Sequence, residues 1–358
     1  MMGFDVNSEE SAKKGLSSAR LGIVDVARRA GVSTATVDRV LNHRPGVRPA
    51  TVQSVLKAAA ELGYLPQDDL YKAMRPQPMR LVFLLPAGTN RFLNMLGDSV
   101  ESAREQFEPL NVQCRCKFVE GFNPQVLVEN LLREGKRADG IAFMALEHPL
   151  VREAVNTLVE KNVHVITLIS DLSSSRRAAY VGLDNRAAGR SAGLLLGRFI
   201  GPRPGKVAMI AGSRHYRGHE EREMGFQHII EEKFPALQVV GLREGHDDAQ
   251  TNYVQSRQLL EQYPDLVGIY NIGGASDGVA KALKEAGRDQ STVFIGHGLT
   301  PDTRALLVDG SMDALINQNL HSTIMNSARI FSNLREGREA MAGVEPMQIS
   351  VVLNENLP

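Results

Sequence analysis

A cluster of hydroxyl, amide and basic side chains between residues 33 and 48 offers the first recognisable chemistry in this sequence. Hydroxyl and amide groups can bond phosphate oxygens, and Arg39 can form paired hydrogen bonds with the edge of a guanine base. The short side chains of Thr34 and Ala35 would let a helix end approach base edges. This chemistry predicts an interface for duplex DNA. The candidate residues are Ser33, Thr34, Ala35, Thr36, Arg39, Asn42, His43 and Arg48.

A helix-turn-helix unit within residues 21–66 would position these side chains. Apolar residues recur there at three- and four-residue spacing, which is typical of helices with one buried stripe. Gly31 can end the first helix and Ser33 can cap the second. The alternative is a plain three-helix bundle with a solvated polar face. Helices are predicted over residues 23–30, 34–41 and 49–62.

A second set of polar side chains follows apolar runs in the rest of the chain. Amide, carboxylate and imidazole groups recur in this set, and aromatic residues are few. Arg222 adds a planar guanidinium that can donate several hydrogen bonds. Such an inventory suits a small polyhydroxylated ligand held by many hydrogen bonds. The candidate ligand-binding residues are Asn90, Phe92, Glu147, Asp171, Asp184, Arg222, Asn271, His297 and Gln318.

Strands that alternate with helices from residue 81 onward would position this second set. The alternation predicts an α/β fold with parallel, doubly wound sheets. The strands are too many for one such sheet, so we expect two Rossmann-like lobes joined at a cleft, with the ligand at the carboxyl ends of the strands. The first lobe is expected over residues 80–183 plus 319–358, and the second over residues 184–318.

The charge of the chain separates a head from a larger body. Residues 1–80 hold 12 basic and 8 acidic residues, whereas the remainder holds 29 and 33, so the head is net positive and the body net negative. We expect residues 1–20 to be disordered and residues 67–79 to form a hinge helix and linker. Residues 80–358 are then expected to bind an effector and to dimerise.

Two further features bear on the compartment of the protein. Cys114 and Cys116 lie two residues apart on an expected strand, and too few other ligands lie nearby to suggest a metal, so we interpret them as thiols in a reducing cytosol. No apolar run reaches membrane-spanning length, and residues 1–20 show no signal-peptide core. We therefore expect a cytoplasmic protein without a membrane partner.

The segment DVARRAGVSTATVDRVLN (residues 25–42) closely resembles the DNA-reading segment of the lactose-repressor (LacI/GalR) family. The resemblance implies a homodimer on double-stranded operator DNA, with Thr34, Ala35 and Arg39 as base readers and Ser33, Thr36 and Asn42 as phosphate contacts. It also implies a hinge that folds on the operator and inserts an apolar side chain, here Leu70 or Met74, into the minor groove. An ordinary linker that never enters the groove is the alternative.

This chain departs from the family pattern at two positions of the head. Gly22 stands where the family usually has a capping Thr or Ser, and Asp38 stands where it usually has Ser. The first departure weakens a helix cap slightly. The second places an anion opposite a polyanion, so we expect Asp38 to tune specificity or to pair with a neighbouring cation. It puts the usual operator sequence in doubt, but not DNA binding.

Residues 80–355 resemble the sugar-binding periplasmic proteins and the matching core of the same family. The matching segments are ITLISDL, VGLDNRAAGRSAG, EREMGF and IGHGLTPDTRALLVDG. The resemblance implies the periplasmic-binding-protein type I architecture, and it places at the ligand Asn90, Phe92, Asp184, Arg222, His297 and Gln318. In this chain Gly273-Gly274 replaces the usual Asn-Asp, and His297 replaces an Asp. The missing carboxylates indicate a ligand that is acidic, phosphorylated or shaped differently from the usual sugars.

These features favour a transcriptional regulator, most simply a repressor of carbohydrate genes that a small sugar-like effector controls. A solute-binding protein for sugar uptake is one alternative, and a sugar-metabolising enzyme is another. The sequence contains no nucleophile elbow, P-loop or metal-ligand cluster, and GHEE at residues 218–221 lacks the second histidine of HExxH. We therefore expect no catalytic site, no cofactor and no metal.

Overall fold

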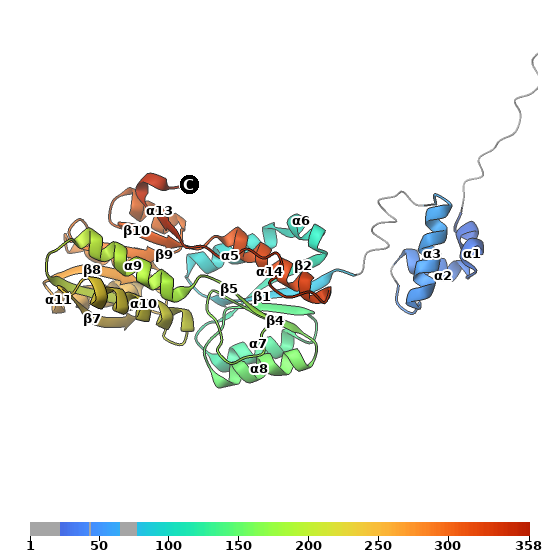
Figure 1. The fold of residues 1–358 in the computed structure, drawn as a ribbon, viewed down its shortest axis with the longest axis horizontal. Helices are drawn as coiled ribbons and strands as arrows, with labels where there is room; N and C mark the ends of the chain where they lie inside the picture. Colours follow the sequence, from blue (N-terminus) through green and yellow to red (C-terminus); the bar gives the residue numbers. More distant parts are fainter. Residues whose placement is uncertain (1–21, 43, 65–76) are drawn as a thin grey trace, which may run out of the picture. The chain divides into compact units, whose positions relative to one another are not determined.

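The computed structural model describes residues 22–42, 44–64 and 77–358 (Figure 1). The chain divides into two compact units, a head that ends at Gln77 and a core that begins at Pro78. The expected lead-in over residues 1–20, His43 and the hinge candidates Leu70 and Met74 lie outside the described residues. No helix in the described ranges is long and apolar enough to cross a membrane.

The head is a bundle of three helices, as the apolar periodicity predicts. Val26, Val37, Val55 and Leu56 are buried together at its centre. Gly31 ends the first helix with a φ of 67°, a conformation that glycine adopts without steric cost. The helices are α1 (Ile23–Ala30), α2 (Thr34–Leu41) and α3 (Pro49–Glu61).

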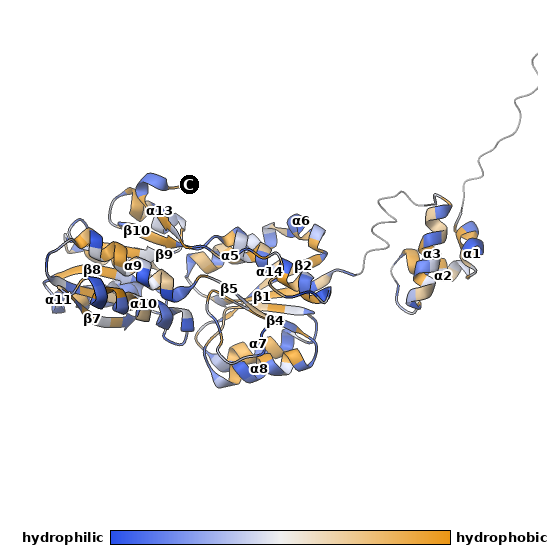
Figure 2. Cartoon of the chain, viewed as in Figure 1, coloured by the Kyte–Doolittle hydropathy of each residue, from blue (hydrophilic) through white to orange (hydrophobic). Residues whose placement is uncertain are grey.

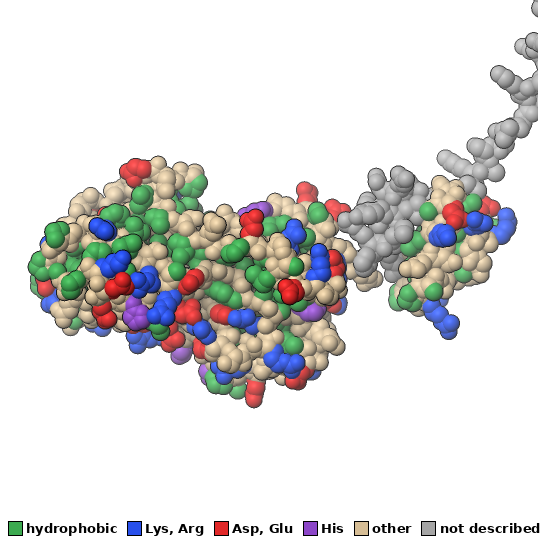
Figure 3. Space-filling view, viewed as in Figure 1, with side chains coloured by type: hydrophobic (Ala, Val, Ile, Leu, Met, Phe, Trp, Pro, Cys, Tyr) green, Lys and Arg blue, Asp and Glu red, His purple; other side chains and the backbone are tan. Residues whose placement is uncertain are grey.

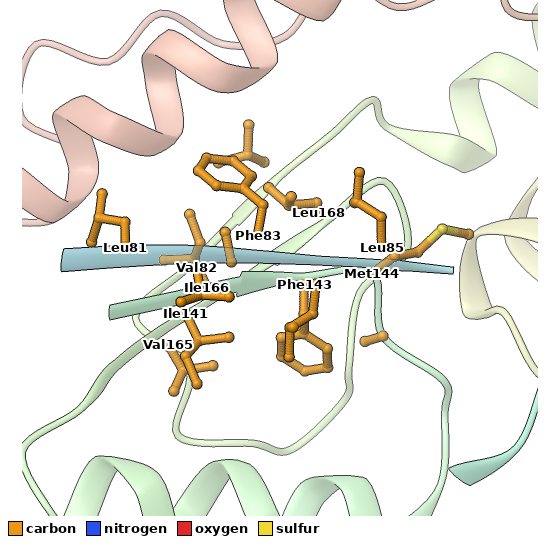
Figure 4. Packing of buried hydrophobic residues seen from close by; sticks show 14 of the residues in the cluster. Leu81, Val82, Phe83, Leu85, Ile141, Phe143, Met144, Val165, Ile166 and Leu168 are labelled. Carbon is orange, nitrogen blue, oxygen red and sulfur yellow. The ribbon is translucent and has the colours of Figure 1, made fainter. Parts of the chain in front are cut away.

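The first lobe of the core is a parallel five-stranded sheet in the order β2-β1-β3-β4-β5. Its apolar side chains cover both faces, with Phe83 on one side and Phe143 on the other (Figure 4). The strands are β1 (Met79–Ala87), β2 (Val112–Glu120), β3 (Gly140–Phe143), β4 (His164–Leu168) and β5 (Ala179–Val181). The helices are α5 (Arg91–Ser102), α6 (Arg104–Phe107), α7 (Pro124–Glu134), α8 (Pro149–Glu160) and α14 (Leu320–Arg335), with a 3-10 turn at Glu108–Leu110.

The second lobe is a six-stranded sheet in the order β11-β10-β9-β8-β6-β7. Apolar residues gather along its strands and on the inner sides of its helices, whereas the outer sides are more hydrophilic (Figure 2). The strands are β6 (Gly205–Ala211), β7 (Leu237–Glu244), β8 (Leu266–Asn271), β9 (Val293–His297), β10 (Ala314–Asn317) and β11 (Ser350–Val352). The helices are α9 (Asn185–Ile200), α10 (Arg217–Lys233), α11 (Ala249–Gln262), α12 (Ser276–Glu285) and α13 (Pro301–Val308), with a 3-10 turn at Asn354–Asn356.

The end of the chain corrects one expected lobe boundary. Helix α14 packs on the first lobe through Ile324, Ala328 and Phe331. Strand β11, however, pairs antiparallel with β10 in the second lobe, with Leu315 opposite Val352. The expectation that residues 319–358 all belong to the first lobe is therefore wrong for the last segment, because the free edge of β10 is available for a further strand.

Candidate nucleic-acid interface and ligand cleft

The exposed side of α2 carries the candidate DNA-reading residues. Ser33 caps the helix, since its Oγ accepts a hydrogen bond from the Thr36 N–H (3.2 Å) and lies 2.9 Å from the Thr36 hydroxyl. Thr34 and Ala35 are exposed in the first turn, and Arg39 is exposed one turn later. The start of α2 therefore offers small side chains followed by a long cation, which is the arrangement that a helix entering a major groove requires.

Asp38 is held by two neighbouring side chains rather than left facing outward alone. Its carboxylate accepts a hydrogen bond from Asn42 Nδ2 (2.8 Å) and pairs with the Arg44 guanidinium (3.2 Å). The predicted phosphate contact Asn42 is thus also an internal partner of Asp38. Pairing with Arg44 reduces the repulsion that an isolated carboxylate would exert on a phosphate backbone.

A cavity between the two lobes, which we call the inner cavity, gathers the candidate ligand-binding groups of the core. The empty space around it amounts to about 510 Å³, a figure that includes space open to solvent. Side chains from both lobes form its walls. Five predicted residues line it: Asn90, Phe92, Arg222, His297 and Gln318. So do residues that we had not predicted: Leu93, Met144, Ile169, Leu183, His219, Asp247, Gly273, Gly274, Gly298 and Ile316.

Close packing of α9 against α10 fixes the position of Arg222. A Cβ at Gly189 would lie 2.0 Å from the Arg222 carbonyl oxygen, so the two helices approach this closely only because position 189 is glycine. Arg222 is 7 % exposed and donates from Nε to Asn185 Oδ1 (2.7 Å) and from Nη1 to the Ile272 carbonyl (2.9 Å). Both acceptors are neutral. Burial lowers the pKa of Arg222, the direction expected for a cation moved out of water.

Asp247 supplies a carboxylate to the inner cavity, although it was not among the candidate residues predicted from the sequence. Its Oδ1 accepts a hydrogen bond from the Gly274 N–H (2.7 Å), and its Oδ2 accepts one from Asn90 Nδ2 (2.9 Å). A Cβ at Gly273 would lie 2.3 Å from Asp247 Oδ1, so the carboxylate occupies space that a side chain at 273 would need. Asp247 comes soon after the end of β7, and the rule that ligands bind at the carboxyl ends of strands could have found it.

Two histidines of the inner cavity are held in the neutral form. His219 is 6 % exposed, and burial lowers its pKa to about 4 although the Asp247 carboxylate opposes this shift. Burial also lowers the pKa of His297 well below its usual range, and the nearby Arg222 charge adds to the effect. His297 Nε2 lies 2.6 Å from the Tyr270 hydroxyl. Both rings therefore act near neutral pH as neutral donors or acceptors.

Four of the predicted ligand-binding residues do not line the inner cavity, because other parts of the fold hold their side chains. Asp184 is exposed and caps α9 by accepting from the Ala187 N–H (2.9 Å). Glu147 pairs with Arg152 (2.8 Å), and Asp171 pairs with Arg177. Asn271 donates to the Gly274 carbonyl (2.8 Å) and to Ser276 Oγ (3.0 Å). The neighbour of Asp184, Asn185, is the residue that reaches Arg222.

The two lobes also touch beside the inner cavity. The ring of Phe122 from the first lobe meets Tyr216 and His246 of the second edge-on, at centroid distances of 5.6 and 5.4 Å. Phe122, Ile169, His246 and Asp247 all have positive φ angles between 53° and 67°. Non-glycine residues rarely adopt this conformation, and it concentrates where function demands it. Four of the eight non-glycine residues with positive φ angles in the described part of the chain therefore lie at the junction between the lobes.

Surface charges of the core are of both signs. On the face shown in Figure 3, basic and acidic side chains are interspersed over the core rather than collected into a single patch. Among the described residues, no group of three or more His, Cys, Asp and Glu side chains could hold a metal ion. Cys114 is buried and Cys116 half-buried, and burial raises the pKa of each thiol to about 12.

A helix-turn-helix head joined to a two-lobed, ligand-binding core defines a class of metabolite-responsive DNA-binding proteins. The family model of the periplasmic binding protein domain matches residues 81–339, and that of the bacterial regulatory proteins of the lacI family matches residues 22–67. The chain therefore consists of a DNA-binding domain of the bacterial lacI regulatory family and a core that belongs to the periplasmic binding protein domain family.

Named relatives cover most of the chain. The HTH-type transcriptional repressor PurR of Vibrio vulnificus is 29% identical over 253 residues, which are 70% of this chain and 73% of that protein. The ribose operon repressor of Halalkalibacterium halodurans is 27% identical over 288 residues, 80% of each chain.

Solved structures agree with the fold of the core. GanP, a glucose-galactose binding protein from Geobacillus stearothermophilus, superposes with a TM-score of 0.71 at 23% identity, over 79% of this chain and 100% of that one. A solute-binding protein from Burkholderia graminis in complex with D-arabinose gives a TM-score of 0.71 at 20% identity, over 79% and 98%. At these identities the likeness establishes the fold.

Proposed function

We propose that this protein is a transcriptional repressor whose operator binding is controlled by a neutral, polyhydroxylated effector held in the inner cavity. The observation that carries the proposal is the presence on one chain of a groove-reading helix and a two-lobed cleft lined by Arg222, Asp247 and His297. The relatives named as repressors support it. A solute-binding protein for uptake would share the core, but the head has no role in uptake.

The neutrality of the effector follows from the charges around the cavity. Arg222 contributes one positive charge and Asp247 one negative charge, while His219 and His297 are neutral. An effector with a net charge would leave an unbalanced charge in a buried space, which costs several kcal/mol. Asp247 thus supplies, from another strand end, one carboxylate to a site where the two usual carboxylates are absent at Gly274 and His297. The charges therefore favour a neutral effector over an acidic or phosphorylated one.

The effector controls operator binding by shifting the equilibrium between two arrangements of the lobes. An effector that contacts both lobes binds one arrangement better, and this difference, typically ~1–3 kcal/mol, is all that it can transmit to the head. In the proposed assembly a homodimer places one head on each half of a pseudo-palindromic site. Since chromosomal DNA is the partner, we place the protein in the cytoplasm, and we assign it no catalytic role.

The test uses the full-length chain in two steps. Selection from a random duplex library should recover a pseudo-palindromic operator, and a thermal-shift screen of sugars, polyols and sugar phosphates should reveal a neutral effector. The variant Arg222→Ala should bind the operator normally and lose the effector response. The variant Arg203→Ala, an exposed arginine of the same lobe, should keep both. Failure to select any duplex at low ionic strength, or normal effector binding by Arg222→Ala, would refute the proposal.

A further inference from the structure

A second cavity adjoins the inner one, and we call it the outer cavity. Its empty volume is about 1320 Å³, against about 510 Å³ for the inner cavity, and both figures include space open to solvent. The two cavities have four wall residues in common: Asn90, Phe92, Gly274 and His297. Only these four residues therefore separate a ligand group in the inner cavity from the outer cavity.

The two lobes approach each other closely at the boundary between the cavities because glycine residues stand there. A Cβ at Gly274 would lie 2.7 Å from Asn90 Nδ2, and a Cβ at Gly298 would lie 3.0 Å from the Phe92 ring. Asn90 is held by the Asp247 carboxylate (2.9 Å), and the Thr89 hydroxyl donates to the Asp247 carbonyl (2.9 Å). Side chains from the two lobes thus meet at a polar boundary, where a linking oxygen atom could find donors and acceptors.

The walls of the outer cavity mix hydrogen-bonding groups with apolar surface. Thr89, Asn94 and Asp98 come from the first lobe, and Asp277 and Asp302 come from the second. Apolar contact is provided by Phe92, Met95 and Pro301. Carboxylates and amides bond hydroxyl groups, and apolar side chains cover the C–H faces between those groups. This combination suits a hydroxyl-rich ring.

The charges of the outer cavity disfavour an anionic occupant. Its walls carry the three carboxylates of Asp98, Asp277 and Asp302, and one guanidinium, that of Arg91. Arg91 is already paired with Asp302 across the lobes (3.1 Å). One amide at the start of each of α5 and α13 is also engaged, since Asn90 accepts from the Leu93 N–H and Thr300 from the Thr303 N–H. A phosphate or carboxylate would therefore meet a net negative wall.

We infer that the effector extends beyond the inner cavity, and that a second, glycosidically linked neutral sugar unit occupies the outer cavity. This inference rests on the proposed function only in taking the inner cavity as the effector site. Both lobes supply walls of the outer cavity, so a second unit there adds contacts between the lobes. The length of the effector, and not only the identity of its first ring, then determines how strongly the lobes are held together.

Isothermal titration calorimetry on the full-length chain tests this inference with matched sugars. The probes are D-glucose with maltose, cellobiose and glucose 6-phosphate, and D-galactose with lactose and melibiose. At least one disaccharide should bind about ten-fold more tightly than its component monosaccharides, the factor that one or two additional hydrogen bonds supply. Monosaccharides that bind as tightly as every disaccharide, or a phosphate ester that binds best, would overturn the inference.

Variants that fill the outer cavity test whether the tighter binding of the disaccharide arises there. Asn94→Trp fills it from the first lobe and Asp277→Trp from the second, so one variant remains informative if the other does not fold. Each should abolish the disaccharide advantage and leave monosaccharide affinity unchanged. The matched control Lys281→Trp, also on α12 but outside the cavity, should retain the advantage. An advantage that survives both cavity-filling variants would overturn the inference.

Absence of binding by every sugar in the panel would also refute the assignment of a neutral glycoside. Operator binding is measured separately on the same preparation, so the two ideas fail independently. A chain that binds its operator and responds to a monosaccharide alone would keep the proposed function and lose the outer-cavity subsite. A chain that binds no operator would lose the proposed function.

Discussion

At the scale of single residues, the arginines of the head differ in whether a carboxylate neutralises them. Arg28 pairs with Asp25 (3.4 Å), Arg29 with Glu61 (2.6 Å) and Arg44 with Asp38. Within residues 22–42 and 44–64, neither Arg39 nor Arg48 makes an ion pair. These two guanidiniums retain their full capacity for DNA, and their positions suggest different uses.

Arg39→Ala and Arg48→Ala should therefore weaken operator binding in different ways. Arg39→Ala should cost roughly 1–3 kcal/mol on the selected operator and relax preference at one base position, because it removes a base-edge contact. Arg48→Ala should weaken binding to all sequences similarly and lower the salt dependence by about one counterion. Fluorescence anisotropy at several salt concentrations measures both. If Arg39→Ala left selectivity unchanged, the base-reading role would be wrong.

The buried His219 predicts a pH dependence of the stability of the core. Its pKa in the folded chain is about 4, whereas an exposed imidazole titrates near 6.5. Between these values the unfolded chain binds the additional proton, so the stabilisation is complete above about pH 6.5 and is lost progressively as the pH falls. The free energy of unfolding should decrease by about 2 kcal/mol at pH 5 through this group.

Denaturant titrations at pH 7.5 and pH 5 check this dependence. The variant His219→Gln should show a smaller loss of stability on acidification than the native chain. His321→Gln, which removes an exposed histidine of α14, should show the native dependence. The same dependence in all three proteins would contradict the assignment.

At the scale of elements, glycines decide how closely α9 and α10 pack. A Cβ at Gly189 would meet the Arg222 carbonyl, and a Cβ at Gly225 would lie 2.1 Å from the Arg186 carbonyl. The contacts are reciprocal, since each helix presents a glycine to the backbone of the other. This packing sets the depth at which the Arg222 side chain enters the inner cavity, so the two helices act as one support for the site.

Gly189→Ala should therefore affect both stability and effector binding. Its methyl group would force the helices apart, which costs about 1–3 kcal/mol of the free energy of unfolding. Because Arg222 moves with α10, the affinity for the effector should also fall. Ser191→Ala, a half-buried change on the same helix, should leave the affinity unchanged. Unaltered effector affinity in Gly189→Ala would show that α9 does not position Arg222.

At the scale of the whole molecule, Asp247 joins the lobes of the core. Its carboxylate accepts from Asn90 of the first lobe and from the Gly274 N–H of the second, and its carbonyl accepts from Thr89. One residue thus contacts the effector cavity, the opposite lobe and the boundary of the outer cavity. Any change in the angle between the lobes must break or remake these bonds.

Asp247→Ala should loosen the two lobes. Hydrogen exchange of the Gly274 and Leu93 amides should accelerate, because the first loses its acceptor and the second depends on a well-held Asn90. Effector affinity should fall by at least about ten-fold, as expected for loss of a charged hydrogen-bond acceptor. Asp248→Ala, which removes only the cap of α11, should leave these two amides unaffected. Identical exchange in both variants would contradict a lobe-joining role.

Most elements of this fold carry signals that lie within a short stretch of sequence. Periodic apolar residues, Ser33 and Gly31 predicted the head, and long apolar runs predicted most strands of both sheets. Strands β5, β10 and β11 are only three or four residues long, which is too short to show a periodic pattern in the sequence, and long-range pairing stabilises them. The same limit explains why the chain end was placed in the wrong lobe.

The sequence by itself determined the classes of element and the kinds of chemistry, because helix caps, turns and alternating runs act over a few residues. Only the tertiary structure decided which polar groups share a cavity. Asp184 faces solvent while its neighbour Asn185 holds Arg222, and Asp247 fills the space left by Gly273. These choices depend on helix packing and on the meeting of two lobes, which bring together residues far apart in the chain.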